Sequence, residues 1–297
     1  SPQPVVFLFG GTGCEYHGAG RGVADALPDY EPYYAAAIRA LDAAAGGSVR
    51  ETDGPAGADI DDPLEAVAVV FALEYAMAAV LQSCGAAPTA VIGHSSGEIV
   101  GATIAGVLSL EAAARLIVAR GLVLRGAMGG GMLVVSAPEA RVRAELSGAV
   151  GVAAVNGDAL CVLSGPRDEL GLVADRLRRQ GIECKTLPIG SAAHSSLLDP
   201  GLAAYDAAVR RETLSPPAIP LMSTLTGRWL TDAEATDPGY WVRQLRHTVD
   251  YYAAARALRA HLGGGFVIEL GAGRALAGQL AGHGSVAGAR GVASPLR

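Results

Sequence analysis

Short apolar runs that end at glycine alternate with longer segments of helical periodicity along most of this 297-residue chain. Val5–Phe9 and Pro88–Ile92 have the length and the apolar composition that predict buried strands. A loop rich in glycine, aspartate and proline spans residues 46–63. The segments with helical spacing, which we expect to form the surrounding helices, lie at about 31–45, 62–82, 98–108 and 110–127.

From Met132 the pattern changes, because short β-rich runs and helices alternate closely. The expected elements are strands at 132–136, 151–155, 160–164 and 183–188, with helices from Pro138 and over 166–180. This βαββαβ order is that of a ferredoxin-like unit, and the glycines at 129–131 form a candidate hinge before it. Helix and strand segments return after residue 197, including Phe266–Leu270. We therefore expect an α/β fold in which a small ferredoxin-like subdomain, residues 129–197, is inserted into a larger one, residues 1–128 and 198–297.

Composition supports a globular protein and excludes several classes. Hydrophobic residues make up 51% of the chain, which is ample for a buried core. A net charge of -6 argues against general nucleic-acid binding, which needs a concentrated basic surface. No uninterrupted apolar stretch of about 20 residues is present, and the run after Ser1 is too short for a signal peptide, so we expect no membrane contact and a cytoplasmic location. The cysteines are far apart without a CxxC pair, which predicts reduced thiols and no metal site: Cys14, Cys84, Cys161 and Cys184.

The most informative motif is Gly93-His94-Ser95-Ser96-Gly97, a GxSxG pattern between a predicted strand and a predicted helix. Such a strand-to-helix elbow holds its central serine in a strained conformation and lifts the hydroxyl clear of the sheet. This context makes Ser95 a candidate nucleophile and makes the large subdomain α/β-hydrolase-like. The alternative is a tight turn that carries no chemistry.

A serine hydroxyl needs a base within hydrogen-bond reach. His94 adjoins Ser95, but consecutive residues on a strained turn point apart, so we expect it to pack locally. Three other histidines lie in polar or glycine-rich stretches where a solvated side chain is expected: His17, His261 and His283. His194 lies where the small subdomain returns to the large one, so it would face the cleft between them. Position alone leaves open whether it is the base or a structural hydrogen-bonding residue.

Several ordered motifs resemble those of malonyl-CoA:acyl carrier protein transacylases and of the acyltransferase domains of polyketide and fatty acid synthases. GHSxGE corresponds to residues 93–98, and an AGVLSLEDA-like segment to residues 105–113. An NG pair lies at 156–157, an HSPLMDP-like segment at 194–200 and a YW pair at 240–241. The resemblance covers almost the whole chain, and the inserted ferredoxin-like subdomain is also a trait of this family.

This resemblance implies a two-step acyl transfer. Ser95 would attack the thioester of an acyl-CoA, and His194 would accept its proton, oriented by a backbone carbonyl that we match to His247. The phosphopantetheine thiol of an acyl carrier protein would then take the acyl group, with no bound cofactor. The oxyanion donors would be the backbone N–H groups of Ser96 and Thr12, although Gly11-Thr-Gly-Cys-Glu15 departs from the family's GQGSQ loop at Thr12, Cys14 and Glu15.

The resemblance also implies a substrate pocket. Arg120 corresponds to the arginine that pairs with the free carboxylate of malonyl-type donors, the alternative being a structural salt bridge. Ser191-Ala-Ala-His194 matches neither the HAFH of malonyl-selective relatives nor the YASH of methylmalonyl-selective relatives, and Val67 stands where relatives often have a glutamine. We expect Ser191, Ala193, Val67 and His94 to contact the substrate, and the smaller side chains to admit an α-substituted malonyl unit.

Two other functions remain open. A serine thioesterase or esterase would share the nucleophile, the base and the oxyanion hole but release the acyl group to water. A non-catalytic docking domain of a megasynthase would not be acylated at Ser95. The expected partners are an acyl-CoA donor, an acyl carrier protein and flanking polyketide synthase domains, in fatty acid or polyketide (antibiotic) biosynthesis. Two arginine clusters could dock an acidic carrier protein or be solvated faces: Arg176, Arg178 and Arg179, and Arg243 with Arg246.

Overall fold

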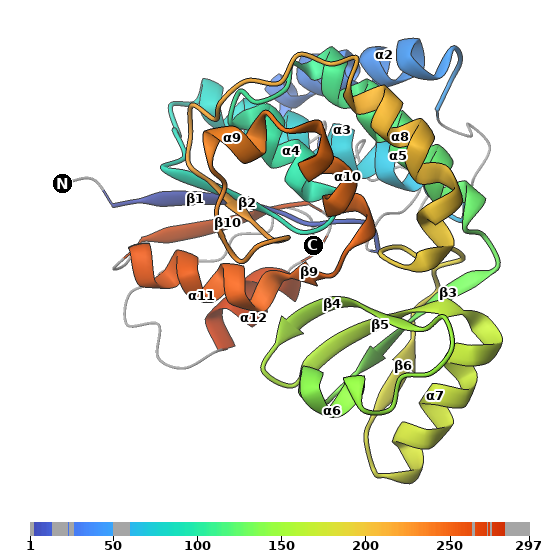
Figure 1. Ribbon diagram of the computed structural model, residues 1–297. Helices are drawn as coiled ribbons and strands as arrows, with labels where there is room; N and C mark the ends of the chain where they lie inside the picture. Colours follow the sequence, from blue (N-terminus) through green and yellow to red (C-terminus); the bar gives the residue numbers. More distant parts are fainter. Residues whose placement is uncertain are drawn as a thin grey trace.

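A computed structural model describes residues 3–13, 23, 27–49, 60–262, 265–271, 273 and 275–282. Its strands form two five-stranded sheets, and helices cover both (Figure 1). The first sheet has the order β10-β1-β2-β7-β8 and the second β6-β3-β5-β4-β9. This is the expected α/β architecture with a second sheet.

The first sheet is parallel except at one edge. β1 pairs in parallel with both β10 and β2, β7 continues the parallel order, and β8 closes the edge as an antiparallel strand. Val6 and Leu8 of β1 belong to one apolar cluster and Phe7 and Phe9 to another on the opposite face. A strand that is buried on both faces reads as a continuous apolar run, which explains Val5–Phe9. The strands are β1 (Val5–Phe9), β2 (Ala90–Gly93), β7 (Leu221–Ser223), β8 (Arg228–Trp229) and β10 (Phe266–Leu270).

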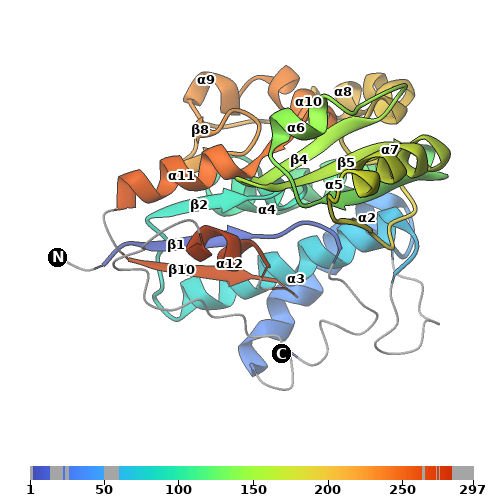
Figure 2. The same ribbon diagram turned by 90° about the horizontal axis from the view of Figure 1, so that it is seen from below.

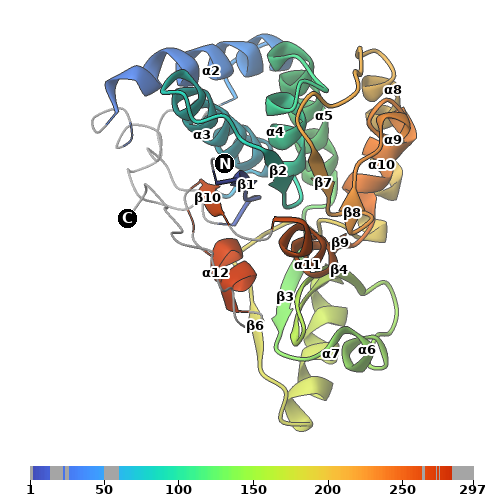
Figure 3. The same ribbon diagram turned by 90° about the vertical axis from the view of Figure 1, so that its left-hand side faces the viewer.

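Helices cover both faces of this sheet (Figure 3). One face carries α2 (Glu31–Ala45), α3 (Pro63–Ser83), α4 (Gly97–Ile104), α5 (Leu110–Gly126), α8 (Leu202–Val209), α9 (Asp232–Ala235) and α10 (Pro238–Arg246), with the 3-10 turns η1 (Pro28–Tyr30) and η2 (Ser196–Gly201). The other face carries α11 (Tyr251–Leu262) and α12 (Ala275–Gly282). By length and composition α3 could cross a membrane, but 83% of its apolar window is buried inside the fold. Helix α3 is therefore a core helix of this fold.

The second sheet follows the predicted βαββαβ order. Its elements are β3 (Gly130–Val135), α6 (Glu139–Arg143), β4 (Gly151–Gly157), β5 (Leu160–Pro166), α7 (Arg167–Arg179) and β6 (Cys184–Thr186). β3 pairs antiparallel with both β5 and β6, and β4 pairs antiparallel with β5. Helices α6 and α7 cover its outer face, and its inner face lies against α11 and α12 (Figure 2). One apolar cluster, which includes Ile92, Ala154 and Tyr251, joins the two sheets.

Three local expectations were wrong. The sheet has a fifth strand, β9 (Val249–Asp250), which comes from beyond residue 197 and pairs in parallel with β4. Helix α4 ends at Ile104, not Leu108, because Gly106 adopts a left-handed conformation with φ 81° and Ser109 then caps α5 by accepting the Ala112 N–H. Gly130 and Gly131 lie inside β3, so of the supposed hinge only Gly129 has a positive φ.

Candidate active site

The nucleophile elbow at Ser95 follows directly from the packing of two glycines. Ser95 has a φ of 55°, a strained value for a residue with a side chain. A Cβ on Gly93 would lie 2.2 Å from the backbone of Gly97, and one on Gly97 would lie 1.9 Å from the Gly10 carbonyl oxygen. Only glycine therefore fits at either position. The turn raises Ser95 above the carboxyl end of β2, at the start of α4, as the motif predicts.

His194 meets Ser95 from the segment that returns from the small sheet. Its Nε2 lies 2.7 Å from Ser95 Oγ, and its Nδ1 lies 2.8 Å from the His247 carbonyl oxygen. A carbonyl can only accept, so Nδ1 carries the proton and Nε2 presents a lone pair to the serine hydroxyl. Only the backbone of His247 enters this contact, because its side chain is exposed. His194, at φ 56°, is the second non-glycine residue with a positive φ among those that the structure describes.

The surroundings of His194 favour its neutral form. Burial lowers its pKa well below the ordinary value, and the positive charge of Arg120 lowers it further. The hydrogen bond to the His247 carbonyl acts in the opposite direction but does not outweigh burial. A neutral imidazole with a lone pair on the serine is the form that accepts a proton.

Two backbone N–H groups flank Ser95 as candidate oxyanion donors. A Cβ on Gly11 would lie 3.4 Å from Ser95 Cβ, so the loop before Thr12 packs directly on the nucleophile. Thr12 and Ser95 line the same cavity. Neither the Thr12 nor the Ser96 N–H has an acceptor among the residues that the structure describes. Free donors beside a nucleophile suit a developing oxyanion. Four residues singled out in the sequence lie outside the described residues: Cys14, Glu15, His17 and His283.

Arg120 reaches Ser95 from α5. It is only 1% exposed, and its guanidinium donates to Ser95 Oγ at 2.9 Å and to Gln244 Oε1 at 2.9 Å. In the described part of the chain no carboxylate lies within 4.0 Å of it, and its Nε has no acceptor. Burial lowers its pKa, against the opposing effects of Tyr205 and Glu98. The described residues therefore show no salt bridge for Arg120, which was the alternative role.

Gln244 is a site residue that the sequence patterns did not single out. It is 2% exposed on α10, and its Nε2 donates to the Ser95 carbonyl oxygen at 2.7 Å while its Oε1 accepts from Arg120. Its one sequence signal is an uncharged polar residue on the buried face of a helix.

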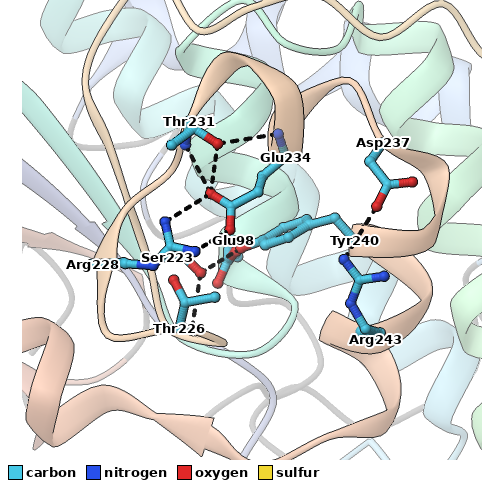
Figure 4. A network of polar contacts seen from close by, with 9 residues as sticks. All are labelled: Glu98, Ser223, Thr226, Arg228, Thr231, Glu234, Asp237, Tyr240 and Arg243. Atoms are coloured by element: carbon cyan, nitrogen blue, oxygen red, sulfur yellow. Dashed lines mark hydrogen bonds and ion pairs between the residues drawn. The ribbon is translucent and has the colours of Figure 1, made fainter.

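Glu98 ends the motif, and Figure 4 shows it beside Ser223 and Tyr240. Its carboxylate accepts hydrogen bonds from the Tyr240 hydroxyl and from the Thr224 hydroxyl and N–H. Thr224 Oγ1 also lies 3.0 Å from the Gly93 carbonyl oxygen, so the network reaches the strand end next to Ser95. Burial raises the pKa of Glu98, opposed by these hydrogen bonds. The network fixes the backbone that presents the nucleophile.

His94 hydrogen-bonds across to the second sheet, and not within the elbow as expected. Its Nε2 lies 2.8 Å from Asn156 Oδ1, and its ring packs against Tyr251. Burial lowers its pKa. His94 and Asn156 also line the cavity in front of Ser95, so they can contact a ligand there.

Two adjoining cavities meet at Thr12 and Ala193. The larger, of about 250 Å³, includes Ser95 and His194 and runs between the ends of the first sheet and the inner face of the second. The smaller, of about 80 Å³, is lined by Val67, Ser191 and Ala193 together with Leu124. The structure thus brings the expected pocket residues together, with Val67 and Ser191 beside the nucleophile's cavity and not within it.

The two arginine clusters are largely occupied by local partners. Arg243 pairs with Asp237 at 3.2 Å, and Arg246 pairs with Asp199. Arg176 donates to the Glu145 carbonyl and to Ser147. A carrier-protein docking role for these clusters stays a prediction. The described residues contain no group of three or more side chains able to hold a metal ion.

The comparisons with known proteins agree with this geometry. The profile of the acyl transferase domain matches residues 6–277. The chain belongs to this acyl transferase family. It is 35% identical over 269 residues to the mycoketide-CoA synthase of Mycobacterium tuberculosis, covering 90% of this chain and 6% of that protein. It is 34% identical over 277 residues to the polyketide synthase GfsB of Streptomyces halstedii, covering 92% of this chain and 5% of that protein.

Solved structures identify the acyl transferase fold with equal clarity. The acyl transferase domain of SpnD, in complex with 2-(pent-4-yn-1-yl)malonyl, has a TM-score of 0.87 and 32% identity, covering 95% of this chain and 68% of that one. FabD from Acinetobacter baumannii has a TM-score of 0.86 at 22% identity, covering 97% and 94%, and supports the fold alone. The predicted family and fold class are confirmed. Eight of the curated relatives that the chain matches are far longer than it, and the chain spans from 4% to 17% of their length.

Proposed function

We propose that this acyl transferase moves a carboxylated, malonyl-type acyl group from CoA to the phosphopantetheine thiol of an acyl carrier protein, through an ester on Ser95. The observation that carries this proposal is Arg120, a buried guanidinium 2.9 Å from Ser95 Oγ with no ion pair among the described residues. Ordinary ester hydrolysis gives such a cation no role. A substrate carboxylate would supply the missing counterion in a bidentate pair.

The first half-reaction follows from the hydrogen bonds at Ser95. His194 Nε2 takes the hydroxyl proton as Oγ attacks the thioester carbonyl carbon. The carbonyl oxygen becomes an oxyanion that the Thr12 and Ser96 N–H groups can bind, and one such donor contributes roughly 3 to 4 kcal/mol. As the intermediate collapses, the C–S bond breaks and the proton on His194 passes to the departing CoA sulfur, which leaves the acyl group on Ser95.

The second half-reaction reverses these roles. The carrier thiol gives its proton to His194 and attacks the acyl-serine carbonyl, and the same two N–H groups bind the oxyanion. The C–O bond to Ser95 breaks, and His194 returns the proton to Oγ. The enzyme is regenerated without a cofactor or metal entering any step.

We also propose that the donor carries an α-substituent. The cavity of about 80 Å³ beside Ala193 is far larger than the roughly 10 to 15 Å³ that one water centre requires. Side chains at Val67, Ser191 and Ala193 are small, so this space stays open to a substituent of several heavy atoms. The similar SpnD domain was solved with a malonyl group bearing a five-carbon substituent, which supports this proposal without deciding it for this chain. Because the curated relatives are long polyketide synthases, we infer that the carrier and neighbouring domains belong to such an assembly.

Intact-protein mass spectrometry with a panel of acyl-CoAs tests the proposal. We expect mass gains from malonyl-, methylmalonyl- and ethylmalonyl-CoA, weak loading from acetyl-CoA and none in Ser95→Ala. A mass gain that persists in Ser95→Ala would exclude Ser95 as the nucleophile. Strict preference for malonyl-CoA over its α-substituted forms would refute the substituent pocket alone.

A further inference from the structure

Gln244 completes a closed ring of hydrogen bonds around the nucleophile. Its Nε2 donates to the Ser95 carbonyl oxygen at 2.7 Å, and its Oε1 accepts from Arg120 Nη1 at 2.9 Å. Arg120 Nη2 then donates to Ser95 Oγ at 2.9 Å. Both ends of Ser95, its backbone and its side chain, are thus tied to α10 and α5 through one buried amide.

The chemistry of the two partners demands an amide at this position. A guanidinium can only donate and a carbonyl can only accept, so the residue between them must accept at one end and donate at the other. A glutamate would leave the Ser95 carbonyl facing an oxygen and would pair with Arg120 as a counterion. An apolar side chain would leave both partners unsatisfied in a buried site. An amide satisfies both groups without adding a charge.

We propose that Gln244 is a positioning residue that fixes Arg120 against Ser95 while leaving the guanidinium charge free for the carboxylate of the acyl donor. This inference rests on the proposed function, because it explains how the site selects a carboxylated substrate. Gln244 touches the nucleophile and the arginine and acts on the substrate through them.

The charged groups around the site explain why an uncharged side chain at position 244 matters. Glu98 acts on Arg120 electrostatically, but it is held by Tyr240 and Thr224 and does not pair with it. The cation in turn faces His194, alongside His94 from the elbow and Arg246 from α10. A carboxylate at position 244 would therefore weaken the attraction for the substrate and reduce the positive field at His194.

Two variants separate charge from geometry. Gln244→Glu adds a counterion to Arg120, whereas Gln244→Met removes both hydrogen bonds at similar size without adding charge. Gln82→Glu is the matched control, because this exposed glutamine lies at the far end of α3, about 20 Å along the helix from Val67. For each folded protein, kcat and KM are measured with malonyl-CoA and acetyl-CoA across a pH series, with folding checked by circular dichroism.

We expect Gln244→Glu to lower the ratio of kcat/KM for malonyl-CoA to that for acetyl-CoA by about tenfold or more. Its acid limb should also move to higher pH, since the pKa of His194 rises when the field of Arg120 is offset. Gln244→Met should lower kcat for both donors, lower the ratio much less than Gln244→Glu does and keep the acid limb, and Gln82→Glu should match the wild type.

If Gln244→Glu and Gln244→Met change the malonyl-CoA to acetyl-CoA ratio of kcat/KM equally, the proposal that an uncharged residue 244 preserves substrate selection is overturned. Wild-type kcat in Gln244→Met would overturn the positioning role, and this holds even if Gln244→Glu does not fold. The proposed function fails separately, when the wild type itself takes up no carboxylated acyl group.

Discussion

Replacing Arg120 by methionine should separate substrate recognition from stability. The guanidinium is 1% exposed and has no carboxylate partner among the described residues. Folding therefore already includes the desolvation cost of an unpaired cation, which an apolar side chain would remove. The variant loses the hydrogen bonds to Gln244 and Ser95, each worth roughly 1.5 to 3 kcal/mol because the donor is charged, and this loss offsets the gain. We expect its free energy of unfolding to lie within about 1 kcal/mol of the wild type, or above it.

Activity should fall much further and selectively. Removing one partner of a buried charge pair between protein and ligand costs roughly 2 to 5 kcal/mol. At 1.36 kcal/mol for each factor of ten, kcat/KM for malonyl-CoA should fall roughly 30-fold to several thousand-fold. Acetyl-CoA lacks the carboxylate, so its kcat/KM should change only through the lost contact with Ser95 Oγ.

Urea unfolding and steady-state transfer with both donors measure these quantities. Wild type and Arg120→Met are compared in the same buffer, because salt weakens charge pairing. The reasoning is refuted if the variant is destabilised by several kcal/mol, or if both donors lose activity by the same factor. Either result would make Arg120 a structural residue.

Further predictions concern the base and the elbow. His247→Ala should keep kcat within about twofold, because only the backbone carbonyl of this exposed residue contacts His194, and steady-state kinetics check this. The acylation rate should stay flat as the pH falls through 6.5 and decline only near the lowered pKa of His194, as stopped-flow acylation over a pH series would show. The free energy of unfolding should fall earlier, from pH 6.5 down to that lowered pKa, because the unfolded chain takes up the proton first, and urea unfolding over the same series checks this. Gly97→Ala should abolish soluble folded protein, since its Cβ would lie 1.9 Å from the Gly10 carbonyl oxygen, whereas Gly171→Ala, on open helix surface, should raise the free energy of unfolding by about 0.5 to 1 kcal/mol in thermal or urea melts.

Features that depend on local sequence were predictable. The elbow is specified within five residues, because its glycines are required by contacts with the adjacent strand and loop. The βαββαβ order is visible because each element carries its own periodicity. Arg120 also stands out as a lone cation among the apolar positions of α5.

Features that depend on contacts between residues far apart in sequence could not be predicted. Strand β9 has only two residues, too few to show an alternating pattern, and exists because β4 offers it an edge. Gln244 lies 149 positions from Ser95 in sequence, and nothing in α10 shows that its amide completes the site. Helix α4 was expected to continue through Gly106, where the backbone turns into the left-handed region.

The central claim is transfer to a thiol, and a single-turnover chase tests it most directly. Ser95 is loaded with a malonyl group, the excess CoA ester is removed, and the acyl-enzyme is mixed with either phosphopantetheinylated carrier protein or buffer. Mass spectrometry should show the acyl mass leaving the enzyme and appearing on the carrier, while the acyl-enzyme in buffer persists over the same time. Loss of the acyl group at the same rate in buffer, with none on the carrier, would make the protein a hydrolase and contradict the proposal.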